Sequence, residues 1–155
     1  FHAGIVRKNL ELNNILSLSG NLWSMDVLNK LRKFAKKEKS DKYSIMDSNI
    51  PHKNTYDAIR YCKAKQIEFD LIPNCPYYEF LDRLSNNKTF VFFPQTPETL
   101  SRVIVEARMS GMSVITNNHV GATKEEWFSL KGESLIDFMN EKRFAITSKV
   151  LEVLT

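Results

Sequence analysis

Apolar residues recur along this chain with two periods, one typical of helices and the other of strands. The helical period is clearest after Ser24, a favourable N-cap residue, where it predicts a helix that runs to about Lys37. The core face of this helix is formed by residues at helical spacing: Val27, Leu28, Leu31, Phe34 and Ala35.

Further helices are expected at 55–65, 77–84, 123–130 and 134–154. Thr55 is expected to cap the first of these, and Ser134 with Asp137 has the spacing of a capping box at the start of the last. Two aromatic pairs, Tyr77-Tyr78 and Trp127-Phe128, are expected to be core or interface anchors rather than a platform on which a base stacks.

Short runs rich in apolar residues predict the strands, at 43–46, 67–72, 90–93 and 113–116. Residues 15–18 are a further candidate strand. Strands and helices alternate, which predicts an α/β fold with a Rossmann-like parallel sheet covered by helices on both faces. Ligands of such sheets bind at the carboxyl ends of the strands, so the loops 47–54 and 94–99 are expected to face one crevice.

Length and composition fit one soluble globular domain over residues 1–155, with 43% apolar and 26% charged residues. The net charge of +4 suits an anionic ligand but is too small to indicate nucleic-acid binding. Cys62 and Cys75 lack the spacing of a metal site, and are expected to be reduced thiols.

No apolar run approaches the ~18 residues of a membrane span, and no secretory signal opens the chain. A cytoplasmic location is therefore expected, with peripheral membrane contact open for the full-length protein. The chain starts at Phe1 rather than at a methionine, which indicates a fragment of a longer protein.

Residues 94–116 carry the most informative motif, in which Glu98 and Glu106 stand eight positions apart on a helix predicted to begin between residues 96 and 101. The free N–H groups of its first turn favour an anion such as a diphosphate. The same acids, with Arg102 between them at i+4, also have the spacing of a salt-bridged helix face, and that alternative stays open.

Residues 90–122 resemble the donor-binding signature of the group 1 glycosyltransferases, which have the GT-B architecture and use nucleotide sugars. The signature runs from an apolar strand and a proline to two glutamates separated by seven residues, then a glycine turn and a second strand. Here these parts are 90–94, Glu98, Glu106-Ala107, Gly111 and 114–116. The specific match covers about a fifth of the chain.

The resemblance implies a role for each residue of the motif. Glu98 would be the catalytic residue that contacts the transferred sugar, and Glu106 would bind the ribose hydroxyls. The backbone amides of Thr99, Leu100 and Ser101 would hold sugar or phosphate oxygens.

Two basic residues complete the implied donor site. Lys53 would contact the diphosphate, the alternative being an exposed loop lysine, and Arg102 would either add a diphosphate contact or pair with a glutamate. The chain departs from the family where 99–102 replaces the usual glycines and where Gly121-Ala122 stands for a glycine pair. Because glycine permits the backbone to approach a ligand closely, its absence at 99–102 argues against such a close approach to the donor.

The resemblance implies that the chain is the C-terminal, donor-binding domain of a retaining, hexosyl-type glycosyltransferase. The full enzyme would have an additional N-terminal domain that binds the acceptor. It would transfer the sugar to a polysaccharide, a glycolipid or another glycoconjugate, or to DNA if the enzyme is encoded by a phage. The isolated domain would have little or no activity. No metal or other cofactor is expected, since no Asp-x-Asp occurs.

Two alternatives come from other classes. One is a non-catalytic Rossmann-like module for protein interaction or ligand sensing. The other is a dinucleotide-binding domain, which the absence of a G-x-G-x-x-G motif disfavours.

Overall fold

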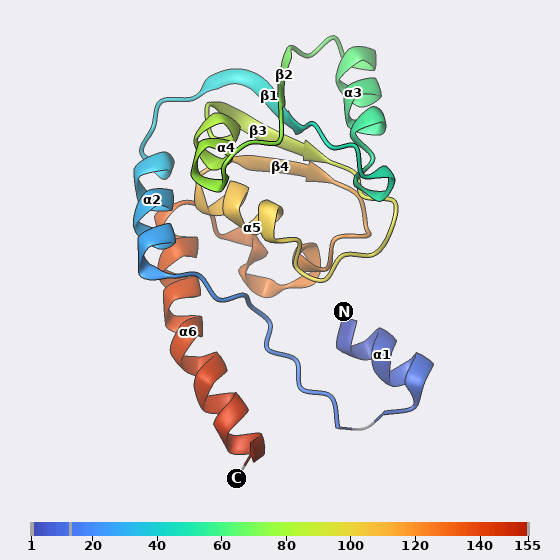
Figure 1. Ribbon diagram of the computed structural model, residues 1–155, viewed down its shortest axis with the longest axis vertical. Coiled ribbons are helices and arrows are strands. Elements are labelled where there is room, and N and C mark those ends of the chain that lie inside the picture. The colour runs from blue at the N-terminus through green and yellow to red at the C-terminus, as the bar shows by residue number, and fades with distance from the viewer. Residues whose placement is uncertain (1, 13, 155) are drawn as a thin grey trace.

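The computed structural model describes residues 2–12 and 14–154 (Figure 1). Its centre is a four-stranded, all-parallel sheet with the strand order β2-β1-β3-β4. The strands are β1 (Ser40–Met46), β2 (Phe69–Ile72), β3 (Asn87–Phe92) and β4 (Ser113–Thr116). Helices cover both faces, which confirms the predicted α/β, Rossmann-like fold.

Helices α2 (Met25–Ala35), α4 (Tyr77–Leu84), α5 (Arg102–Met109) and the first half of α6 (Glu133–Leu154) pack on one face of the sheet. Helix α3 (Thr55–Ala64) covers the other face. Strand β3 lies between these layers, with Phe90 and Phe92 in the larger core and Val91 in the smaller one. A strand buried on both faces needs a continuous apolar run, which is the pattern seen at 90–92.

Most predicted elements are confirmed to within a few residues. Ser24 caps α2, and its hydroxyl oxygen accepts a hydrogen bond of 3.3 Å from the Val27 amide. Helix α4 and strand β4 have the predicted bounds.

Four predictions outside the candidate site were wrong. Asn54, in the left-handed conformation, is the residue before α3, and the Thr55 hydroxyl donates instead to the Met46 carbonyl at 2.9 Å. Residues 123–130 form no α-helix but parts of two 3-10 helices, η2 (Gly121–Lys124) and η3 (Glu126–Ser129).

The third concerns the capping box. Helix α6 already includes Ser134, and the Asp137 carboxylate lies 2.5 Å from the Arg32 guanidinium of α2. An inter-helix ion pair has replaced the local cap. The candidate strand at 15–18 is also not formed, because this segment has no neighbouring strand with which to pair.

The N-terminal helix α1 (His2–Leu10) lies away from the sheet, and residues 14–24, which precede α2, form no helix or strand (Figure 1). In the same view α6 continues well beyond α2 at its C-terminal end. Within the described residues, no helix has the length and apolar character that crossing a membrane requires.

Candidate functional site

Two loops at the carboxyl edge of the sheet hold the segment 93–101 in place. The Gln95 amide donates to the His52 carbonyl of the 3-10 helix η1 (Pro51–Lys53) at 2.8 Å. On its other side, the Glu98 amide donates to the His119 carbonyl at 2.8 Å, and the Gly121 amide to the Glu98 carbonyl at 2.9 Å. Loops that follow β1, β3 and β4 therefore meet, as the parallel topology predicts.

The backbone of Gly121 packs closely against the backbone of Thr99. A Cβ atom at this position would lie 2.1 Å from the Thr99 carbonyl oxygen, well inside any permitted contact. The segment before α5 can therefore approach the 117–121 loop only because residue 121 has no side chain. This gives a physical reason for one of the glycines that the sequence motif contains.

A cleft of about 550 Å³ opens at this edge. Five of the seven predicted site residues line it: Lys53, Glu98, Thr99, Ser101 and Arg102. Asn21, His52, Thr96 and Pro97 complete the wall. Leu100 instead faces a neighbouring apolar cavity, and Glu106 lies beneath Arg102 outside both linings.

Lys53 and Glu98 form an ion pair across the cleft, with 2.5 Å between Nζ and Oε1. Their side chains are only 26% and 14% exposed, so the pair is partly shielded from water. The Lys53 ammonium also lies 5.6 Å from the centre of the Phe92 ring. The alternative of a freely exposed loop lysine is therefore wrong, because Lys53 is tied to the first motif glutamate.

The backbone between Glu98 and α5 is strained and open to a ligand. Ser101, the residue before α5, has a φ of 48°, which non-glycine residues seldom adopt. Its hydroxyl is buried, and no partner for it exists among the residues the structure describes. Within the same residues, no acceptor pairs with the amides of Thr99, Leu100 and Ser101.

Helix α5 begins at Arg102, later than predicted, so Glu98 is not on the helix. The expectation of two glutamates along one helix was wrong, because Glu98 precedes α5 and its backbone is bonded to the loop after β4. The salt-bridged face is formed only in part. Arg102 Nε lies 2.8 Å from Glu106 Oε1, while Glu98 pairs with Lys53.

Glu106 is a buried carboxylate with three donors on one oxygen. Besides Arg102, its Oε1 accepts hydrogen bonds from Trp23 Nε1 at 3.0 Å and from the Tyr77 hydroxyl at 2.5 Å. The Arg102 guanidinium carbon lies over both aromatic rings, 5.4 Å from the centre of the Trp23 ring and 5.9 Å from the centre of the Tyr77 ring. Burial and the hydrogen bond to Glu106 raise the pKa of Tyr77.

A third hollow, of about 600 Å³, adjoins the cleft and shares Lys53 with it. It lies between the loops after β1 and β2, and its walls mix apolar, polar and acidic groups: Met46, Asp47, Ser48, Asn49, Ile50, Asn74, Cys75, Tyr77 and Phe80. Tyr77 therefore has one side in this hollow and its hydroxyl on Glu106.

Six residues of the site were not among those predicted from the sequence. The cleft is also lined by Asn21, His52, Thr96 and Pro97, while Trp23 and Tyr77 hold Glu106. Only Tyr77 had been singled out, as an anchor in the core or at an interface. It is 39% exposed and functions as a hydrogen-bond donor, as does Tyr78, whose hydroxyl bonds Asp26.

Comparisons of the chain with protein-family models, with curated proteins and with solved structures give no match. Across residues 2–12 and 14–154, no three side chains of the His, Cys, Asp and Glu types gather as they would around a metal ion.

Proposed function

We propose that this chain is the donor-binding domain of a nucleotide-sugar-dependent glycosyltransferase. The observation that carries the proposal is the cleft at the carboxyl edge of the sheet. It combines two cations, Lys53 and Arg102, with unpaired backbone amides and the N-terminus of α5. Oriented N–H groups and basic side chains are the groups that bind a diphosphate.

Arg102 is suited to a diphosphate because its position is already fixed. Its Nε bonds Glu106 and its guanidinium carbon lies over two aromatic rings, yet half of the side chain, 51%, stays exposed to solvent. A guanidinium held in this way loses little conformational freedom when an anion binds. Arg102 would thus provide the fixed charge at a position where the family that the motif resembles has glycines.

When the donor binds, the ion pair between Lys53 and Glu98 would break, and each residue would contact a different part of the donor. The lysine is a flexible cation that can turn from Glu98 to a phosphate oxygen. The carboxylate is then free to accept hydrogen bonds from sugar hydroxyls. In this proposal the ion pair keeps both groups at the site in the absence of a ligand.

The hollow beside the cleft would take the nucleoside. It shares Lys53 with the cleft, so a molecule that spans both would place its phosphates at the shared residue. Tyr77 and Phe80 offer aromatic surface for a base, and Asn74 an amide for its edge. A direct bond from Glu106 to ribose stays a prediction, since one oxygen of that carboxylate already has three donors.

In the proposed reaction the bond from the sugar's anomeric carbon to the diphosphate breaks, and a bond to the acceptor oxygen forms. The acceptor proton passes to the departing diphosphate, which leaves as the nucleoside diphosphate. Lys53, Arg102 and the α5 N-terminus would stabilise the negative charge that develops on the leaving group. The acceptor-binding N-terminal domain would belong to the same protein.

The second candidate function is a non-catalytic sensing or interaction module. Its support is the buried Glu106, which is bonded as a structural carboxylate, and the loop 99–102, which has no glycine. A sensor would bind the nucleotide without transferring a sugar, whereas an interaction module would not bind it at all.

Calorimetry with uridine and guanosine diphosphates and their sugars tests the proposal. Lys53→Ala and Arg102→Ala are each expected to weaken nucleotide binding by about tenfold or more, because each removes a charge-assisted phosphate contact. Lys33→Ala, which removes an exposed charge from α2, is the matched control. Absence of binding by the unaltered chain, or equal affinity in all three variants, would contradict a donor site.

A further inference from the structure

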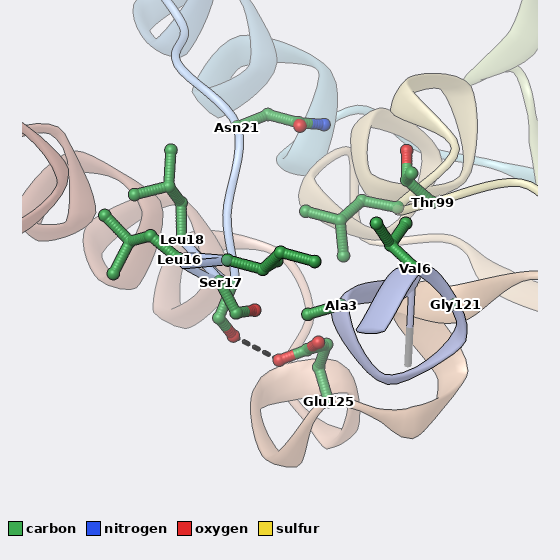
Figure 2. A pocket seen from close by; sticks show the side chains of 12 residues that line it. Ala3, Val6, Leu16, Ser17, Leu18, Asn21, Thr99, Gly121 and Glu125 are labelled. Carbon is green, nitrogen blue, oxygen red and sulfur yellow. Dashed lines mark hydrogen bonds between the residues drawn. The ribbon is translucent and has the colours of Figure 1, made fainter. Parts of the chain in front are cut away.

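A second cavity, of about 300 Å³, lies between the N-terminal helix α1 and the start of α5 (Figure 2). Its lining is mostly apolar: Ala3, Val6, Ile15, Leu16, Leu18 and Leu100. In Figure 2, Leu16 and Leu18 lie across the cavity from Ala3 and Val6. The volume is at the lower end of the range found for small-molecule sites.

Polar contacts at both ends hold the walls of this cavity. Arg7 of α1 donates to the Ile15 carbonyl at 2.6 Å, which ties the helix to the segment that follows it. The Ser19 hydroxyl bonds the Glu125 carboxylate, and Trp127 Nε1 donates to the Ser19 carbonyl at 3.1 Å. The apolar side chains are thus held around an open space, and Leu16 remains 44% exposed.

The cavity and the cleft of the proposed donor site share two residues, Asn21 and Thr99. Figure 2 shows Asn21 at the end of the cavity opposite Glu125. A molecule that crosses this shared wall would have its polar end beside Lys53, Glu98 and Arg102. Its other end would be enclosed by aliphatic side chains.

We infer that this cavity binds the apolar chain of an amphipathic acceptor, an alkyl chain attached to a hydroxylated head group, while the N-terminal domain of the same protein would supply the remaining acceptor contacts. The inference rests on the proposed transferase function for the direction of the molecule, with the hydroxyl at Thr99 and the chain between α1 and residues 15–18. It places the acceptor class among lipid-linked molecules. A polysaccharide or a nucleic acid would leave these aliphatic walls in contact with water.

Octyl β-glucoside, used below its micelle concentration, is the probe for the cavity, with methyl β-glucoside as the head group alone. Binding to the full chain is measured by calorimetry and by amide chemical shifts. The octyl compound is expected to bind and to shift residues of α1 and 15–21, while the methyl compound binds at least about tenfold more weakly. Equal affinity for the two compounds would overturn the inference.

Two variants and a control test whether the alkyl chain lies in this cavity. Leu16→Asp places a charge on the exposed wall and Ala3→Trp fills the space, and each is expected to weaken octyl glucoside binding by about tenfold or more. Leu10→Asp alters an α1 residue that is 61% exposed and outside the lining, and should bind as the unaltered chain does. Equal binding by all variants would place the detergent elsewhere and overturn the inference.

Nucleoside diphosphate titrations of the same variants separate this inference from the proposed function. If the nucleotide binds unchanged while octyl glucoside does not bind, the cavity is not an acceptor site and the donor site stands. If only octyl glucoside binds, the cavity binds amphiphiles, but the proposed transferase function and the acceptor role both fail.

Discussion

The Thr99 carbonyl oxygen occupies the space where a side chain on Gly121 would begin, 2.1 Å from an ideal Cβ position. The contact joins the segment before α5 to the loop after β4, and it is adjacent to the hydrogen bond from the Gly121 amide to the Glu98 carbonyl. Correct placement of Glu98 therefore depends on the absence of a methyl group at residue 121.

Gly121→Ala is expected to destabilise the fold by about 1–3 kcal/mol, because the backbone at Thr99 must move away from the inserted methyl. Urea unfolding followed by circular dichroism measures the loss. Gly20→Ala is the control, since its Cβ would meet only side-chain atoms, the nearest at 3.5 Å. A loss for Gly121→Ala no larger than for Gly20→Ala would contradict the steric argument.

Glu106→Gln is expected to destabilise the chain by about 1–3 kcal/mol. The amide loses the charge that pairs with Arg102, and it accepts hydrogen bonds from Trp23 and Tyr77 less strongly than the carboxylate does. Glu133→Gln is the matched control, because its carboxylate is 54% exposed and pairs with Arg32 at the surface. Such a pair contributes about 0–1 kcal/mol, so similar losses in both variants would argue against a structural role for Glu106.

The secondary structure and the position of the cleft could be predicted because they depend on local patterns. The run at 90–92 is apolar at every position, which predicts a strand buried on both faces. Because the loops of Lys53 and Glu98 each follow a parallel strand, they were expected at the same edge of the sheet, and they meet there. The start of α5 could not be predicted, because it depends on hydrogen bonds from Gln95 and Glu98 to distant loops.

The hydrogen-bond partners of Glu106 could not be predicted from the sequence for the same reason. Trp23 lies 83 positions before its acceptor and Tyr77 lies 29 positions before it. Neither spacing has a period that a helix or a strand would generate. Only the i+4 pair of Arg102 with Glu106 left a local signal, and that pair is formed.

The Tyr77 phenol provides a pH-dependent test of this cluster. Burial and the bond to Glu106 raise its pKa above the ordinary value of about 10, so the folded chain retains this proton after the unfolded chain has lost it. The stabilisation is fully present below about pH 10 and declines as the pH rises toward the raised pKa. The free energy of unfolding should therefore fall more steeply above pH 10 for the unaltered chain than for Tyr77→Phe.

Absorbance of tyrosinate gives an independent measurement. The difference in absorbance between the unaltered chain and Tyr77→Phe isolates one phenol of the five in the chain. We expect that phenol to ionise above pH 10 in the folded state and near pH 10 in urea. Ionisation near pH 10 in both states would show that Glu106 and burial do not act on Tyr77.

Cys75 reports on the hollow proposed for the nucleoside. Its thiol is half-buried in that lining, whereas Cys62, on the core-facing side of α3, is fully buried, and burial raises the pKa of its thiol. Dithiodipyridine should therefore react quickly with one thiol of the folded chain and with the second only after unfolding. Cys75→Ser should remove the fast reaction and leave the slow one.

Nucleoside diphosphate should protect that fast-reacting thiol. If the base lies between Tyr77 and Phe80, it covers the lining around Cys75, and only unoccupied chains react. At a ligand concentration of 100 times the dissociation constant the rate should fall by about 100-fold. Inorganic pyrophosphate, which fills the cleft without a base, is the control and should leave the rate nearly unchanged. An undiminished rate with nucleotide, under conditions where calorimetry records binding, would place the base outside this hollow.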